Sequence, residues 1–106
     1  MSYARRVDAN HRAVIEAMED EGAAVTSLHK AGEGVPDALL SIAGVWAIVE
    51  IKDGSKPPSA QKLTEPQKAF WALHKDCGAW AIIRDVEAAR RFVRALKGLE
   101  PPTVTK

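Results

Sequence analysis

The sequence predicts an α/β fold: a sandwich in which a four-stranded mixed sheet is flanked by helices. Three observations predict it. Segments with helical and strand-like periodicity alternate along the chain, two strand-like runs are separated by only two residues, and 106 residues suffice for one layered core. We therefore expect a single domain over residues 1–97 and a flexible C-terminal tail over residues 98–106.

The composition is that of a globular protein and excludes several other classes. About 46% of the residues are hydrophobic and 27% are charged, close to the average for globular domains. No apolar run reaches the roughly 20 residues of a membrane span, and the N-terminal residues lack the hydrophobic stretch of a signal peptide. We therefore expect a cytoplasmic protein without a membrane partner. The single cysteine, Cys77, excludes an internal disulfide, and we expect it to pack in the core.

Residues 8–21 are expected to form the first helix, because apolar residues recur there at helical spacing. Either Asp8 or Asn10 can cap its start, and Gly22 follows its end. The apolar residues on the shared face are Val14, Ile15 and Met18. The next segment, residues 23–28, contains β-branched residues and is predicted to be the first strand.

Residues 37–42 and 45–52 are two strand-like runs separated only by Ala43 and Gly44. This spacing is typical of a tight hairpin. The second run is apolar on both faces until its end, as strands buried on both faces are. We therefore expect the run 45–52 to be a central strand.

The remaining elements follow an exposed loop at residues 53–63, which contains glycine and proline. Thr64 is expected to start a second helix, residues 79–83 a fourth strand, and Asp85 to cap a last helix that Gly98 ends. The second helix supplies apolar surface through Phe70, Trp71 and Leu73. The stripe of the last helix comprises Val86, Ala89, Val93 and Leu96. We expect the three tryptophans, Trp46, Trp71 and Trp80, to lie mostly in the core, although any that is exposed could stack on a splayed base.

The hairpin has a chemical consequence at its open end. With a two-residue turn, Asp37 falls directly opposite Glu50, and directly opposed residues have β-carbons about 5 Å apart. Like charges at that distance destabilise a sheet unless something offsets them. Mg²⁺ would do so, with Mn²⁺ as a substitute, taking ligands from the two carboxylates, water and the carbonyl of Ile51.

Lys52 is expected to lie beside this pair of carboxylates. Side chains alternate along a strand, so Trp46, Ile48, Glu50 and Lys52 are expected on one face. A carboxylate pair with a lysine suits metal-assisted hydrolysis of a phosphodiester. The metal lowers the pKa of a bound water and neutralises developing charge, while the lysine orients the water or helps to deprotonate it.

These residues also carry a family resemblance. The segment Gly34-Val35-Pro36-Asp37, then Glu50-Ile51-Lys52, then Gln67 on the next helix, resembles the PD-(D/E)XK nuclease superfamily. Within it, the chain resembles small phage-type proteins related to the VRR-NUC and Holliday-junction-resolvase groups, from about residue 8 to residue 93.

The resemblance implies a restriction-endonuclease-like α/β sandwich and a metal-dependent nuclease. It implies that Asp37 and Glu50 are metal ligands, that Lys52 is the catalytic lysine and that Gln67 assists the site. It also implies a homodimer that acts on branched or otherwise structured DNA.

One position departs from the family pattern. Resolvase-like relatives have a glutamate ligand on the first helix, and this chain has His11 near that position. His11 shares a helix face with Val14 and Met18, so its imidazole is expected to point toward the sheet. There it would either bind the metal or make only a hydrogen bond. Asn10 and Glu16 are further candidates for the same role.

Two other assignments have simpler alternatives. Thr64 and Gln67 match a capping box, in which the glutamine side chain bonds the backbone of the threonine and needs no role in the site. Lys56, Lys62 and Lys68 either contact DNA phosphates or form a solvated basic face.

The glycine-rich loop 30–34 lacks the Gly-Lys-Ser/Thr ending of a phosphate-binding loop, so we expect no nucleotide cofactor. The leading hypothesis is a structure-selective DNA endonuclease that uses magnesium. The alternatives are a non-cleaving DNA-binding or architectural module with a nuclease fold, and an assembly protein that uses the sheet for protein contacts.

Overall fold

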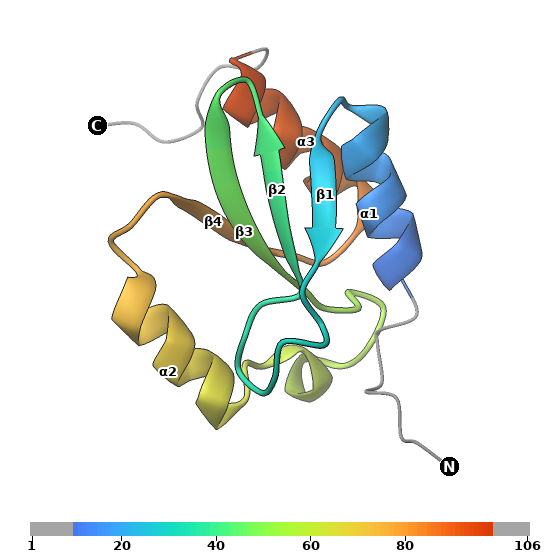
Figure 1. The fold of residues 1–106 in the computed structure, drawn as a ribbon. Helices are drawn as coiled ribbons and strands as arrows, with labels where there is room; N and C mark the ends of the chain where they lie inside the picture. The colour runs from blue at the N-terminus through green and yellow to red at the C-terminus, as the bar shows by residue number, and fades with distance from the viewer. Residues whose placement is uncertain (1–9, 99–106) are drawn as a thin grey trace, which may run out of the picture.

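The computed structural model describes residues 10–98 and has the predicted α/β architecture (Figure 1). Its helices are α1 (His11–Asp20), α2 (Glu65–His74) and α3 (Val86–Lys97), and a short 3₁₀ helix spans Pro58–Gln61. Its strands are β1 (Ala24–Ser27), β2 (Ala38–Ile42), β3 (Val45–Ile51) and β4 (Ala79–Ile83). The expected tail lies outside the described residues, except for Gly98, which ends α3 as predicted.

The four strands form one open sheet in the order β1-β2-β3-β4. The first three strands are antiparallel neighbours, and β4 runs parallel to β3. The sheet is therefore mixed, as predicted. The prediction that residues 45–52 form a central strand is also confirmed, because β3 pairs with β2 on one side and with β4 on the other.

The β2–β3 connection is the predicted two-residue turn. Ala43 has φ 53° and Gly44 has φ 80°, so both turn residues lie in the left-handed region. Turns of this kind match the twist of the flanking strands and hold them in a fixed register. Ile42 accordingly pairs with Val45 and Leu40 with Ala47, as the sequence predicts.

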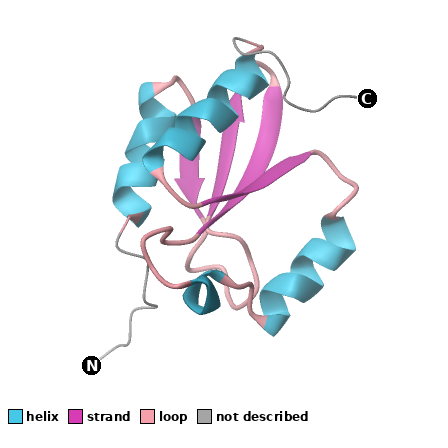
Figure 2. Cartoon of the chain, turned by 180° about the vertical axis from the view of Figure 1, so that it is seen from behind, coloured by secondary structure: helices cyan, strands magenta, loops and turns pink. Residues whose placement is uncertain are grey.

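Helices α1 and α3 cover one face of the sheet, behind the strands in Figure 1 and in front of them in Figure 2. The largest side chains buried in this layer are Val14, Met18, Leu40, Val49 and Val93. No helix crosses the opposite face in Figure 1, where α2 stands beside the sheet. The sheet therefore has one face that α1 and α3 cover and one open face. The candidate site lies on the open face.

The helix ends agree with the sequence at α2, at α3 and at the end of α1, which Gly22 follows with φ 106°, but the start of α1 lacks the side-chain cap. Asp85 accepts a hydrogen bond from the Ala88 N–H at 2.7 Å and so caps α3. Of the two candidate caps, Asn10 occupies the N-cap position of α1, but its side chain makes no cap hydrogen bond. Its amide donates instead to the carbonyls of Lys52 and Arg84, at 3.1 and 2.9 Å, just beyond the ends of β3 and β4. Asp8 lies outside the described residues.

Several residues expected in the core lie at the surface. Cys77 is exposed, because it falls in the turn between α2 and β4 rather than in either element. Trp46 is 66% exposed and Trp80 is 38% exposed, whereas Trp71 is buried. The tryptophans on the strands belong to the face that α1 and α3 leave open. Within residues 10–98, no helix has the length and apolar character needed to cross a membrane.

An ion cluster joins the two helices of the covered layer. Glu21, at the end of α1, lies within 3.7 Å of Arg90, 3.1 Å of Arg94 and 3.7 Å of Lys97 on α3. The hydrogen bond from Arg94 and the charges of the three cations hold the pKa of Glu21 below its ordinary value. The cluster fastens α1 to α3 on the side of the sheet away from the candidate site.

Candidate active site

Asp37 lies at the start of the hairpin, one residue before β2. The ladder between β2 and β3 ends at the pair Ala38 and Val49, and the same register continued by one residue sets Asp37 against Glu50. The Asp37 carboxylate accepts a hydrogen bond from the backbone N–H of Ile51 at 2.7 Å. Its own carbonyl accepts from the Leu28 N–H at 2.7 Å. The aspartate is thus fixed between β1 and β3.

Glu50 and Lys52 point to the open face at the end of β3, and both are buried. Glu50 is 3% exposed and Lys52 is 8% exposed. The Lys52 Nζ lies 3.7 Å from the Glu50 Oε2. Burying an acid and a base is costly unless each is paired and hydrogen-bonded, and this pair meets both conditions.

Gln67 of α2 supplies those hydrogen bonds. Its Nε2 donates to the Glu50 Oε2 at 2.9 Å, and its Oε1 accepts from the Lys52 Nζ at 3.0 Å. The carboxamide therefore bridges the acid and the base. It also determines which way the Lys52 ammonium points.

The same glutamine completes the capping box at the start of α2. Its Oε1 accepts a second hydrogen bond from the Thr64 N–H at 2.8 Å, and its backbone N–H donates to the Thr64 Oγ1 at 3.3 Å. From the sequence, a role in the cap and a role in the site are alternatives for Gln67. One side chain serves both, because an amide oxygen has two lone pairs and accepts from Thr64 and from Lys52.

The glycine of the Gly-Val-Pro-Asp segment brings the two parts of the site together. Gly34 has φ +86°, and a β-carbon on it would lie 2.7 Å from the carbonyl oxygen of Pro66. Only glycine fits this approach. The loop before Asp37 therefore packs against the first turn of α2, directly beside Gln67.

Asp53 is a buried acid that the sequence analysis did not single out. Its Oδ1 accepts from the Ser55 N–H at 2.9 Å and from the Ser55 hydroxyl at 2.6 Å. These hydrogen bonds lower the pKa of Asp53. The Asp-Gly-Ser pattern is a known signal for a turn of this kind, so this position was open to prediction. Its role is to order the chain directly after Lys52.

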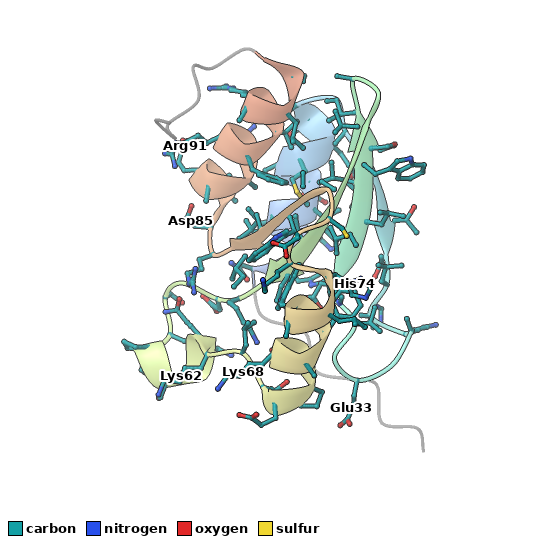
Figure 3. All side chains as sticks on the ribbon, turned by 90° about the vertical axis from the view of Figure 1, so that its left-hand side faces the viewer. Glu33, Lys62, Lys68, His74, Asp85 and Arg91 are labelled. Carbon is teal, nitrogen blue, oxygen red and sulfur yellow. The ribbon has the colours of Figure 1, made fainter. Side chains whose placement is uncertain are left out.

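The three lysines predicted to contact phosphates, Lys56, Lys62 and Lys68, are all exposed. Figure 3 shows Lys62 in the segment before α2 and Lys68 on α2, both at the lower end of that view. Lys68 forms an ion pair with Glu65 at 3.2 Å. Lys56 lies in the turn after β3, where its backbone N–H donates to the Asp53 carbonyl at 3.1 Å.

The structure does not add a third ligand to the carboxylate pair. Within residues 10–98, no three His, Cys, Asp or Glu side chains gather in a way that could hold a metal ion. The ring of His11 instead makes an edge contact with His29 at a centroid distance of 6.4 Å. Of the other candidates, Glu16 is exposed and pairs with Arg12 at 3.8 Å.

The residues present still suit a small divalent cation. Mg²⁺ in proteins retains several waters and is bound by one or two carboxylates. Asp37 and Glu50 provide two from adjacent strands, and the carbonyl of Ile51 lies between Glu50 and Lys52 in sequence. The donor set is all oxygen, which is the chemistry that Mg²⁺ and Mn²⁺ prefer.

Comparison of the chain with protein families, with curated proteins and with solved structures found no match. The resemblance to the PD-(D/E)XK superfamily therefore rests on the motif and its spacing. What the fold adds is the positions of the motif residues. Asp37 directly precedes β2 and Glu50 lies on the adjacent β3, and Lys52 and Gln67 lie within hydrogen-bond distance of each other.

Proposed function

We propose that this protein is a metal-dependent DNA endonuclease that hydrolyses phosphodiester bonds, with a preference for branched or junction DNA. The observation that carries the proposal is the hydrogen-bonded group of Glu50, Lys52 and Gln67 at the end of the central strand. Buried, ordered ionisable groups of this kind are concentrated at functional sites.

Asp37, Glu50 and the carbonyl of Ile51 would hold the metal, Mg²⁺ or Mn²⁺. When bound there, the ion would lower the pKa of a coordinated water and neutralise charge on the phosphate. His11 remains a candidate only for a contact outside this set, because it packs beside His29.

The chain's own residues would prepare the site for the reaction. In hydrolysis a water oxygen attacks phosphorus, and the bond from phosphorus to the leaving sugar oxygen breaks. Lys52, whose ammonium is oriented by Gln67, would position the water and stabilise the negative charge that develops on the phosphate oxygens. The Ile51 N–H would keep the Asp37 carboxylate in place throughout.

Lys56, Lys62 and Lys68 would contact phosphates on either side of the cut. Each such contact should steepen the dependence of binding on salt by about one unit of logarithmic slope. A homodimer would let two copies hold two DNA arms, and sedimentation velocity would measure it. We expect such a nuclease to act in the cytoplasm, without a membrane or nucleotide cofactor.

The test is cleavage of forked, flapped, four-way and linear DNA of the same sequence, with Mg²⁺ or Mn²⁺ and with EDTA. Wild type should cut a branched substrate faster than linear duplex and should not cut in EDTA. Asp37→Ala and Lys52→Ala should lose cleavage, and each variant should first be shown to be folded by circular dichroism.

Two outcomes would change the proposal in different ways. If wild type binds these DNAs and never cuts them, the protein is a DNA-binding or architectural module that retains a nuclease fold. If cleavage persists in Asp37→Ala, the metal site has been assigned to the wrong residues.

A further inference from the structure

Two tryptophans lie open on the face of the sheet that α1 and α3 leave uncovered. Trp46 of β3 is 66% exposed, and Trp80 of β4 is 38% exposed. Trp80 pairs with Ile48, two residues along β3 from Trp46. The two rings are therefore diagonal neighbours on adjacent strands of one face.

This face is continuous with the candidate active site. Residues alternate along β3, so Trp46 points to the same side of the sheet as Glu50 and Lys52. Four residues along the strand, or about 13 Å, separate Trp46 from Glu50. Stacked bases in one DNA strand are about 3.4 Å apart, so a strand with a phosphate at Glu50 reaches Trp46 within about four bases.

The Trp80 ring is held rigidly in place. It stacks on Trp71 of α2, with ring centroids 4.3 Å apart and planes inclined by 31°. Its indole N–H already donates to the Lys75 carbonyl at 3.2 Å, so the exposed 38% of the side chain offers a ligand apolar contact rather than a donor. Trp71 follows Gln67 by one turn of α2, which ties this stacked pair to the active-site helix.

The chemistry of the face favours nucleobases over other ligands. Apart from Asp37 and Glu50 at its end, the strand positions on this face are uncharged: Ala24, Thr26, Leu39, Ser41, Trp46, Ile48, Trp80 and Ile82. A polyanionic strand therefore meets no carboxylate on these strands before it reaches the site. Exposed aromatic rings bind unpaired bases by stacking, whereas the bases of a duplex are already stacked on one another.

We propose that Trp46 and Trp80 form a stacking surface for unpaired bases. These bases belong to the DNA strand whose phosphodiester bond is cut at the site of Glu50 and Lys52. This inference rests on the proposed nuclease function and narrows its substrate class. The substrate is DNA with a single-stranded segment within a few nucleotides of the cut, as in a flap or a fork.

The first test measures binding without cleavage. Fluorescence anisotropy in EDTA would compare a labelled oligothymidylate with a duplex of equal length. Trp46→Ala should weaken oligothymidylate binding by roughly 5- to 100-fold and duplex binding much less. Trp46→Phe, which keeps a ring, should retain most of the affinity. Leu73→Ala is the matched control, because Leu73 is 78% exposed on α2 and lies off the strands.

The second test uses cleavage with Mn²⁺. Wild type should cut flapped DNA faster than blunt duplex, and Trp46→Ala should reduce that ratio by lowering the rate on flapped DNA more than the rate on duplex. We choose Trp46 for the substitution because its side chain is exposed and its loss should leave the fold intact. Loss of Trp80 would also remove the ring that stacks on Trp71.

Several results would overturn the inference. One is an oligothymidylate affinity that Trp46→Ala leaves unchanged, even if wild type cuts DNA. Another is a wild-type dimer in sedimentation velocity that Trp46→Ala converts to a monomer, since the face would then join two copies of the chain. Trp46-dependent binding by a wild-type protein that cuts no DNA would instead support the stacking surface and reject the nuclease function.

Discussion

Gln67 donates its side-chain amide to the Glu50 carboxylate at 2.9 Å, and this contact joins α2 to the end of the central strand. Because Gln67 also completes the cap of α2, the start of that helix and the geometry of the candidate site depend on one side chain. Substitutions at Gln67 and at Thr64 can distinguish the role of Gln67 in the cap from its role in the site.

Gln67→Ala should lower both activity and stability. Loss of a partner that orients a metal ligand typically costs 10- to 100-fold in activity, and we expect cleavage to fall by about that factor. The free energy of unfolding should fall by more than about 1 kcal/mol, because the side-chain half of the capping box is lost and the buried Glu50 and Lys52 also lose their hydrogen-bond partner. Cleavage rates and urea unfolding would measure the two effects.

Thr64→Ala is the control for this pair of effects. It removes the hydroxyl that caps α2 but leaves the Gln67 contacts to Glu50 and Lys52. We expect a loss of about 1 kcal/mol in the free energy of unfolding, smaller than for Gln67→Ala, with cleavage within a few-fold of wild type. Equal loss of cleavage in the two variants would mean that the helix start, and not the amide, governs the site.

Gly34→Ala should disturb the contact between the Asp37 loop and α2. The added β-carbon would meet the Pro66 carbonyl oxygen at 2.7 Å, which adds overpacking to the strain of a positive φ. Gly32→Ala is the matched control, because Gly32 also has a positive φ but its β-carbon would meet nothing within 4 Å. We expect Gly34→Ala to be less stable than Gly32→Ala by about 1–3 kcal/mol in urea unfolding. Equal stabilities would show that the loop is not packed against α2.

Ala43→Asn should stabilise the hairpin that sets Asp37 against Glu50. Ala43 has φ 53°, which costs an alanine about 1 kcal/mol or more, whereas asparagine followed by glycine favours this turn. The free energy of unfolding should rise by about 1 kcal/mol, and Ala43→Val should lower it. A destabilising Ala43→Asn would argue against the two-residue turn.

Glu21→Gln should remove a pH-dependent part of the stability. The pKa of Glu21 in the folded protein lies below its ordinary value of 4.5, so its ion cluster stabilises the fold above that pH. The contribution is lost as the pH falls below 4.5 toward the folded pKa. Glu21→Gln should therefore be less stable than wild type at pH 7, with a difference that shrinks in acid. Unfolding midpoints at pH 7, 5 and 3.5 would measure this.

Glu16→Gln is the control, since Glu16 is an exposed residue of α1 that pairs only weakly with Arg12. It should change the stability by a few tenths of a kcal/mol at most. A Glu21→Gln variant as stable as wild type at pH 7 would contradict the role of the cluster.

Much of this fold could be predicted from local sequence signals. Counting residues outward from the Ala43-Gly44 turn gives the pairing of β2 with β3. Thr64, Asp85 and Gly98 mark helix ends that the structure reproduces. These signals act over a few residues, so one sequence suffices to recognise them.

The sequence does not predict the surroundings of Trp46 and Asn10 correctly, because these depend on where the helices pack against the sheet. That packing is decided by tertiary contacts. Trp46 is apolar and lies on a central strand, but α1 and α3 both pack on the other face. Asn10 precedes a helix as a cap would, but its amide donates to the carbonyls of Lys52 and Arg84, just beyond two strands and 42 and 74 residues away. Neither relationship follows from periodicity.

Cleavage by Glu50→Gln tests the central claim most directly, because this change keeps the size of the buried side chain and removes its negative charge. We predict that wild type cuts branched DNA in Mn²⁺ and that Glu50→Gln, shown by circular dichroism to be folded, cuts it at least about 100-fold more slowly. Cleavage by Glu50→Gln at the wild-type rate would contradict the assignment of this carboxylate to the active site.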